Sequence, residues 1–187
     1  CGQCAEHIAS LESICCTVNA SAGIESTYAI EPAREAKNVM IIGSGPAGME
    51  TARIAAKRGH RVELYDKDPR MVGGMNLAGI FNPEIEKFSN YLKTLIDHKK
   101  VKITLNHEVT TEWVQTSMPD VVVIAFGAGL ISPDIPGIES PNVITGDDVR
   151  AMLTGNYNRS GEVNSQKFKG FYWIIASFFL RNFPNPA

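Results

Sequence analysis

The sequence predicts an α/β fold, a Rossmann-like three-layer sandwich of the FAD/NAD(P)-binding type with a parallel sheet. An apolar stretch at 39–42 runs into Gly43-Ser44-Gly45-Pro46-Ala47-Gly48, which has the G-x-G-x-x-G spacing of a dinucleotide-binding turn. A second strand-like segment at 61–65 ends at Asp66, as such a βαβ unit requires. Further strand-like segments at 102–105 and 121–125 alternate with helical patterns, which indicates a parallel sheet.

Each glycine of the turn has a physical task. Gly43 permits the tight turn, Gly45 lets a pyrophosphate approach the backbone, and Gly48 allows close packing of helix and strand. The free N–H groups at the start of the following helix face the phosphates. The Asp66 carboxylate accepts hydrogen bonds from an adenosine ribose and repels a 2′-phosphate. The predicted ligand is therefore FAD, NAD or ADP.

The remaining elements follow from periodicity. Apolar residues at helical spacing predict a helix over 83–98, and six of them are assigned to the core: Ile85, Phe88, Tyr91, Leu92, Leu95 and Ile96. Residues 68–81 are predicted to form a loop. The run 121–125 is typical of a buried parallel strand, and Gly127 follows it, so we expect Gly127 near the pyrophosphate. We expect helices on one face of the sheet and a small antiparallel piece on the other.

Three segments divide the chain. Residues 1–36 are predicted to be a cysteine-bearing connector, 37–155 the FAD/ADP-binding domain, and 156–187 a linker and aromatic tail. The aromatic side chains at 168–183 either pack on the same domain or dock on a following NAD(P)H domain. A short helix is predicted to start at Asp147-Asp148, and Asp134 is interpreted as a loop residue.

Composition excludes several partner classes. The 187 residues carry a net charge of -2, so no basic surface points to nucleic acid and no acidic tail is present. The longest apolar run, 171–180, is about half of the ~20 residues that a membrane-spanning helix needs. We therefore expect a soluble, cytoplasmic protein. The chain opens on Cys1 without a Met, which suggests a fragment or a processed piece.

All cysteines lie in the first sixteen residues: Cys1, Cys4, Cys15 and Cys16. Clustered cysteines with C-x-x-C spacing indicate zinc, an iron–sulfur cluster or a redox dithiol. A secreted disulfide framework would not leave the rest of the chain without cysteine.

These motifs, together with Cys16-Thr17-Val18-Asn19, Gly73-Gly74-Met75-Asn76-Leu77-Ala78 and the run 120–125, resemble one family. It comprises the multidomain NADH:flavin oxidoreductases related to old yellow enzyme, with 2,4-dienoyl-CoA reductase and trimethylamine dehydrogenase among them. The resemblance covers about residues 1–153. It implies a cluster-binding strip followed by an FAD- or ADP-binding domain, with an FMN-bearing barrel elsewhere in the parent chain.

The resemblance also implies the site residues. Those expected to hold FAD or ADP are Gly43, Gly45, Pro46, Ala47, Gly48, Asp66, Arg70, Gly73, Gly74, Met75 and Val109. A 4Fe-4S cluster is implied at Cys1, Cys4 and Cys16, with Cys15 or His7 as fourth ligand, because His7 and Ile8 stand where the family has its third cysteine. Phe126 stands where relatives commonly have Thr, and His107 is interpreted as a surface loop residue.

The function that the resemblance implies is the FAD-binding, electron-transferring part of an NAD(P)H-dependent flavin oxidoreductase of the enoate reductase type. NAD(P)H, held by a domain beyond residue 187, would reduce FAD, and single electrons would pass through the cluster to FMN. No catalytic residue is expected in this chain, and an oligomer is possible. The alternatives are a non-enzymatic ADP-binding structural module, as in amine dehydrogenases, and a simple NAD-binding domain, which would leave Gly73-Gly74 and the cysteines unexplained.

Overall fold

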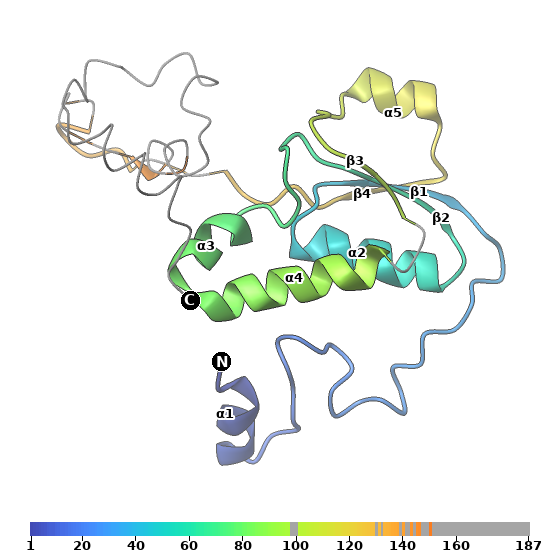
Figure 1. Ribbon diagram of the computed structural model, residues 1–187, viewed down its shortest axis with the longest axis horizontal. Helices are drawn as coiled ribbons and strands as arrows, with labels where there is room; N and C mark the ends of the chain where they lie inside the picture. The colour runs from blue at the N-terminus through green and yellow to red at the C-terminus, as the bar shows by residue number, and fades with distance from the viewer. Residues whose placement is uncertain are drawn as a thin grey trace. The chain divides into compact units, whose positions relative to one another are not determined.

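A parallel sheet of four strands forms the centre of the described chain (Figure 1). The computed structural model describes residues 1–97, 101–129, 131, 133–138, 140, 143, 145–146 and 150. The strands are β1 (Asn38–Ile42), β2 (Arg61–Tyr65), β3 (Lys102–Thr104) and β4 (Val121–Ile124), in the order β3-β2-β1-β4. All three strand pairings are parallel, which confirms the predicted α/β fold.

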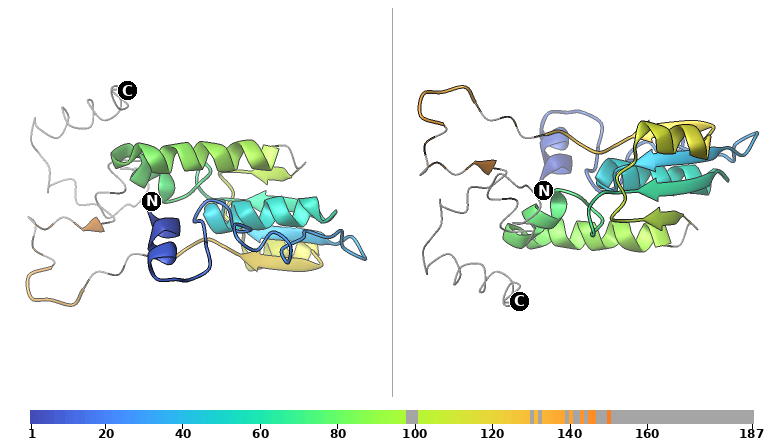
Figure 2. Two further views of the ribbon diagram at one scale, coloured as in Figure 1. Left: turned by 90° about the horizontal axis from the view of Figure 1, so that it is seen from below. Right: turned by 90° about the horizontal axis from the view of Figure 1, so that it is seen from above.

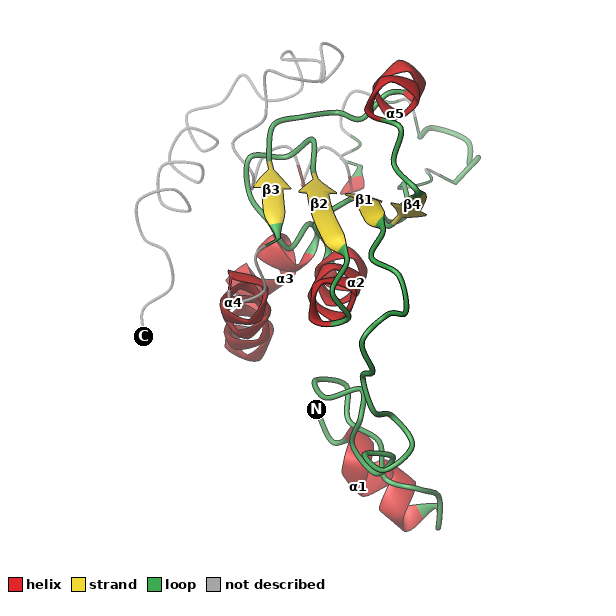
Figure 3. Ribbon diagram, turned by 90° about the vertical axis from the view of Figure 1, so that its right-hand side faces the viewer, coloured by secondary structure: helices red, strands yellow, loops and turns green. Residues whose placement is uncertain are grey.

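The described residues form five helices. They are α1 (Gln3–Ala9), α2 (Pro46–Lys57), α3 (Met75–Phe81), α4 (Pro83–Asp97) and α5 (Thr111–Ser117). Figure 2 shows α2 and α4 running side by side, and Figure 3 shows both on the face of the sheet opposite to α5. The expected antiparallel piece is absent from the described residues, where α5 occupies that face instead. Thr110 caps α5 by accepting a hydrogen bond from the N–H of Trp113, so this segment begins a helix.

The chain divides into two compact units, which are described separately. The first comprises residues 1–73 and 87–126 and contains the sheet, and the second comprises 74–86 and 127–187. Within the second unit, Gly79 of α3 is buried and a Cβ there would lie 3.4 Å from the Cβ of Glu86. The domain boundaries predicted at residues 37 and 155 remain predictions.

The core lies between the sheet and helices α2 and α4. Ile41 of β1 and Leu64 of β2 are neighbours in register and fully buried, and Met49 of α2 packs in the same layer with 1% of its surface exposed. Leu92 and Ile96 of α4 are buried as predicted. The other members of the predicted α4 core differ: Tyr91 is 45% exposed, and Ile85, Phe88 and Leu95 are half-buried. Tyr91 instead lines a groove beside the connector.

Two expectations about individual elements were wrong. The predicted loop 68–81 contains α3, whereas α1 lies in the predicted connector, for which no helix had been assigned. The run 121–125 was predicted to be a buried central strand, but β4 is the outer strand of the described sheet. Val122 is 38% and Ile124 68% exposed, because in the described part of the chain β4 is paired only with β1. The aromatic tail, the linker and Asp147-Asp148 lie outside the described residues.

None of the described helices is both long enough and apolar enough to span a bilayer.

An ion pair joins the paired residues Glu63 of β2 and Lys102 of β3. Lys102 Nζ lies 2.6 Å from Oε1 of Glu63, and the Tyr65 hydroxyl donates to Oε2 at 2.5 Å. The bond from Lys102, then that from Tyr65, lowers the pKa of Glu63, and the pair raises the pKa of Lys102. Burial, followed by the bond to Glu63, raises the pKa of Tyr65.

Glu63 should make the fold more sensitive to acid. Because its folded-state pKa lies below 4.5, its contribution to stability is present above that value and is lost as the pH falls through the lowered pKa. In Glu63→Gln this part of the pH dependence should disappear, so the stability curves of the two proteins should converge at low pH. Chemical denaturation at a series of pH values measures this, and parallel curves would contradict it.

Leu64→Ala should destabilise the protein by about 2–5 kcal/mol, because it leaves a cavity at a fully buried position beneath the nucleotide turn. Leu11→Ala is the matched control: Leu11 is 96% exposed, so its truncation should change the free energy of unfolding by less than about 0.5 kcal/mol. Urea denaturation followed by circular dichroism compares the two, and equal effects would show that the assigned core is wrong.

Candidate dinucleotide-binding site

The glycine turn at the end of β1 is closed by backbone contacts. The N–H of Gly43 donates to the carbonyl of Tyr65 at 2.7 Å, and Gly43 has a φ of 107°. A Cβ on Gly43 would lie 2.4 Å from the carbonyl oxygen of Ala125, and one on Gly48 would lie 1.9 Å from the carbonyl oxygen of Gly43. Both positions therefore require glycine for the turn to form.

Gly45 differs from the other two glycines because the space beside it is open. A Cβ built there would meet no atom within 4 Å, and its φ of -67° is accessible to any residue. Gly45 is the N-cap of α2 and exposed Pro46 follows at its first turn. The first N–H groups of a helix lack intrahelical partners and favour anions. The open space thus lies where the pyrophosphate of a dinucleotide would approach the backbone.

Asp66 is held against this turn by Ser44. Both the backbone N–H and the hydroxyl of Ser44 donate to Oδ2 of Asp66, each at 2.6 Å. The N–H of Asp68 donates to Oδ1 at 2.9 Å. Ser44 is completely buried, whereas Asp66 is half-buried. The predicted turn and the predicted acidic residue are therefore brought together directly.

The loop at residues 70–73 is hydrogen-bonded to the same serine, Ser44. The N–H of Val72 donates to the carbonyl of Ser44 at 2.8 Å, and Gly73 comes next, where a Cβ would lie 3.6 Å from the Cα of Gly45. Val72 is fully buried with a φ of 71°, which is unfavourable for a β-branched residue. Such backbone strain is typical of functional loops. This loop thus lies beside the glycine turn, and the cofactor-binding role of Gly73 remains a prediction.

The other predicted cofactor residues are placed as follows. Arg70 and Ala47 are exposed. The second unit contains Gly74, Met75 and Gly127, whereas the glycine turn belongs to the first unit. Phe126 is 69% exposed, and its Cα would lie 2.6 Å from a Cβ on Gly43.

The loop after β3 lies beside the end of β2. The N–H of His107 donates to the carbonyl of Asp66 at 2.9 Å, which places half-buried Val109 two residues from this contact. His107 was expected to be a surface loop residue; it does lie in a loop, but it is half-buried. Its ring packs against Trp113 and Tyr65, with centroid distances of 4.5 and 5.3 Å, and its buried Nε2 has no hydrogen-bond partner among the described residues. Aromatic packing under α5 accounts for this burial.

The cysteines are free and are not assembled into a metal site. Cys1 and Cys4 are exposed, Cys15 and Cys16 are half-buried, and Cys1 Sγ lies 3.1 Å from Oγ1 of Thr17. Hydrogen bonds from the backbone of residues 18 and 19 lower the pKa of Cys16. In the described part of the chain no three His, Cys, Asp or Glu side chains are grouped so that they could hold a metal. In this arrangement the residues do not fit a cluster, and the metal assignments remain predictions.

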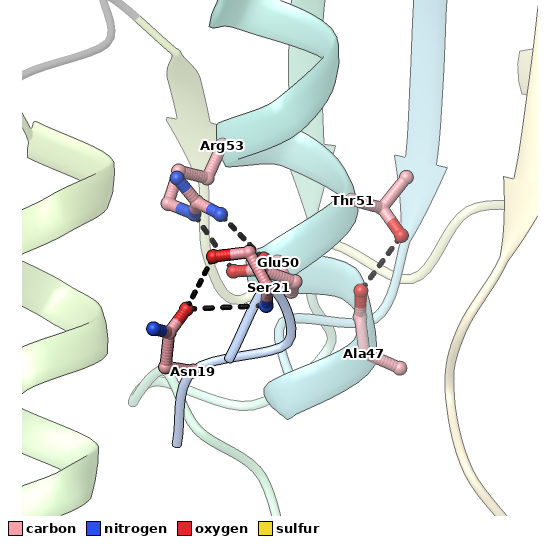
Figure 4. Close-up of polar contacts among 6 residues, drawn as sticks. All are labelled: Asn19, Ser21, Ala47, Glu50, Thr51 and Arg53. Carbon is pink, nitrogen blue, oxygen red and sulfur yellow. Dashed lines mark hydrogen bonds and ion pairs between the residues drawn. The ribbon is translucent and has the colours of Figure 1, made fainter. Parts of the chain in front are cut away.

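Part of the connector, including Asn19 and Ser21, lies beside helix α2 (Figure 4). Arg53 donates to both carboxylate oxygens of Glu50, at 2.6 and 2.8 Å, and this bond raises the pKa of Arg53. Beside them Ser21 donates through its N–H and its hydroxyl to Oδ1 of Asn19. Residues of 18–30, α2 and α4 line a groove of about 310 Å³ there. The connector therefore packs on the face of α2 that is not used by the nucleotide turn.

Sequence reasoning missed two residues of this site. Ser44 occupies the variable position of G-x-G. The sequence signal that could have identified it is a hydroxyl side chain at the second residue after the strand. The positive φ of Val72 has no sequence signal, because valine is not expected in that conformation.

A glycine turn after β1, an open helix N-terminus and an acidic residue after β2 define a dinucleotide-binding domain. The chain belongs to the pyridine nucleotide-disulphide oxidoreductase family, whose sequence model matches residues 37–159. It is 33% identical over 142 residues to a bilirubin reductase of Mediterraneibacter gnavus. The matched region covers 75% of this chain and 22% of that protein. It is 35% identical over 130 residues to an NADH oxidase of Thermoanaerobacter brockii, with 68% and 20% covered.

Solved structures agree with this assignment. A 2-naphthoyl-CoA reductase bound to 2-naphthoyl-CoA superposes with a TM-score of 0.74 and 34% identity, covering 80% of this chain and 23% of that one. The chain thus spans about a fifth of the length of the relatives that it matches. These findings confirm the predicted resemblance: the chain corresponds to a part of a multidomain flavoprotein oxidoreductase.

Gly45→Ala and Gly48→Ala should separate binding from folding. At Gly45 the added methyl enters open space, so the free energy of unfolding should change by less than about 1 kcal/mol while nucleotide affinity falls about ten-fold or more. At Gly48 the methyl meets backbone at 1.9 Å, so stability should fall by more than about 2 kcal/mol. Thermal unfolding and calorimetric titration with ADP measure both, and normal ADP binding by Gly45→Ala would contradict the assignment.

Proposed function

We propose that this chain is the FAD-binding, electron-transferring part of an NAD(P)H-dependent flavin oxidoreductase. The observation that carries the proposal is the direct bond between Ser44 of the glycine turn and the Asp66 carboxylate. It supports the proposal because the backbone that would bind a pyrophosphate and the acid that would bind a ribose lie next to each other. The names of the relatives, a bilirubin reductase, an NADH oxidase and a 2-naphthoyl-CoA reductase, support redox chemistry.

The residues of the first unit fit the adenosine and pyrophosphate parts of FAD. The open backbone at Gly45 and the start of α2 would receive the pyrophosphate, and Asp66 would accept a ribose hydroxyl. Its negative charge disfavours a ligand with a 2′-phosphate. Exposed Arg70 would approach the phosphates from the loop that ends at Gly73. When bound, FAD supplies the conversion of a two-electron hydride transfer into single-electron steps.

A second candidate function is the binding of ADP as a structural ligand. It is favoured because Asp66, which Ser44 and Asp68 hold in place, would contact only the adenosine half, which FAD and ADP share. Phe126 adds bulk next to Gly43, at the edge of the sheet where the remainder of FAD would extend. The isoalloxazine ring therefore distinguishes the two candidates.

The rest of the parent protein belongs to the same proposal. We expect an FMN-bearing barrel, an NAD(P)H domain and an unsaturated carbonyl or related substrate, in keeping with the reductases among the relatives. A 4Fe-4S cluster at the cysteines is implied by the resemblance alone, and no electron-transfer step is derived through it. Four free thiols favour a reducing compartment such as the cytoplasm.

The purified chain, mixed with FAD and separated from the excess, should retain the absorption bands of oxidised flavin. Chromatography of the released cofactor distinguishes FAD from ADP. Asp66→Asn should weaken FAD binding about ten-fold, because a charged hydrogen-bond acceptor is lost.

Asp68→Asn is the matched control, since it makes the same charge change two residues away and leaves the backbone N–H of Asp68 in place. A colourless protein that retains ADP would support the structural module. Failure to bind either nucleotide would overturn both candidates.

A further inference from the structure

The carboxylate of Asp66 is almost saturated by donors from the protein itself. Oδ2 accepts two hydrogen bonds from Ser44, and Oδ1 accepts one from the N–H of Asp68. A carboxylate has about four acceptor positions. One position therefore remains, and it lies on Oδ1.

The two donors of Ser44 fix the rotation of this group. The terminal torsion of an aspartate has broad energy wells, so a single donor would leave the carboxylate free to turn. Here the Ser44 backbone and hydroxyl hold one oxygen at 2.6 Å, and Asp68 holds the other. Ser44 is fully buried, which shields both bonds from competing water.

We propose that Ser44 is a positioning residue that orients Asp66 so that only Oδ1 receives the ligand, through a single ribose hydroxyl. The inference rests on the proposed nucleotide-binding function and goes beyond it by assigning a specificity role to the variable residue of the glycine turn. Ser44 itself would not touch the ribose, because both of its donor groups are already directed at Asp66.

The test compares ADP with 2′-deoxy-ADP and 3′-deoxy-ADP by calorimetric titration of the nucleotide-free chain. The unaltered protein should bind ADP about ten-fold more tightly than one of the two analogues. In Ser44→Ala this preference should fall to about two-fold or less, while the affinity for that analogue stays the same. Ser44→Cys, which fills the space but donates weakly, should behave like Ser44→Ala and guards against an effect of the small cavity.

Further variants of the chain serve as controls in this experiment. Asp66→Asn should remove the same preference, and combining it with Ser44→Ala should add little, because both act on one contact. Thr51→Ala is the matched control, since it deletes a hydroxyl of α2 that bonds to the carbonyl of Ala47 at 2.7 Å (Figure 4). It should keep the full preference for ADP.

The outcomes separate the inference from the function on which it rests. If Ser44→Ala weakens all three ligands equally, or changes none, the positioning role is overturned while nucleotide binding stands. Equal penalties for both analogues, each removed in Asp66→Asn, would overturn the single-hydroxyl assignment. If the unaltered chain binds no ADP, the proposed function itself fails, and the inference fails with it.

Discussion

The contact between Ser44 and Asp66 connects the segments on which the site depends. Ser44 donates twice to the carboxylate after β2, and its carbonyl accepts the N–H of Val72. One buried residue thus ties the end of β1 to the end of β2 and to the loop at 70–73. Because parallel strands end at the same edge of the sheet, the backbone and the short side chain of a single residue can connect these segments.

This arrangement is rigid because the layer beneath it is well packed. Ile41 and Leu64 lie next to each other in adjacent strands and are fully buried two residues before Gly43 and Asp66, respectively. The glycine at 48 brings α2 onto the backbone of Gly43, so the helix start is fixed relative to the strand. The open space at Gly45 is therefore held by packing, and a ligand could enter it without reorganising the chain.

The sequence was informative where local rules decide the structure. The strands at 38–42 and 61–65, the helix after Gly45 and the helix from Pro83 follow from periodicity and glycine spacing. It failed where long-range packing decides. Ile124 was expected in a central strand but is exposed at the edge of the described sheet, and the ring of His107 packs against Tyr65, which lies on a different strand, β2. In the site itself, Asp66 was predicted, whereas Ser44 depends on a contact across 22 residues.

A crystal structure of the chain with ADP tests the central claim most directly. The account predicts that the pyrophosphate lies against Gly45, that a ribose hydroxyl lies within hydrogen-bond distance of Oδ1 of Asp66, and that both bonds from Ser44 to Oδ2 are kept. A nucleotide bound elsewhere, or an Asp66 side chain that turns away from Ser44 to meet the ribose with both oxygens, would contradict it.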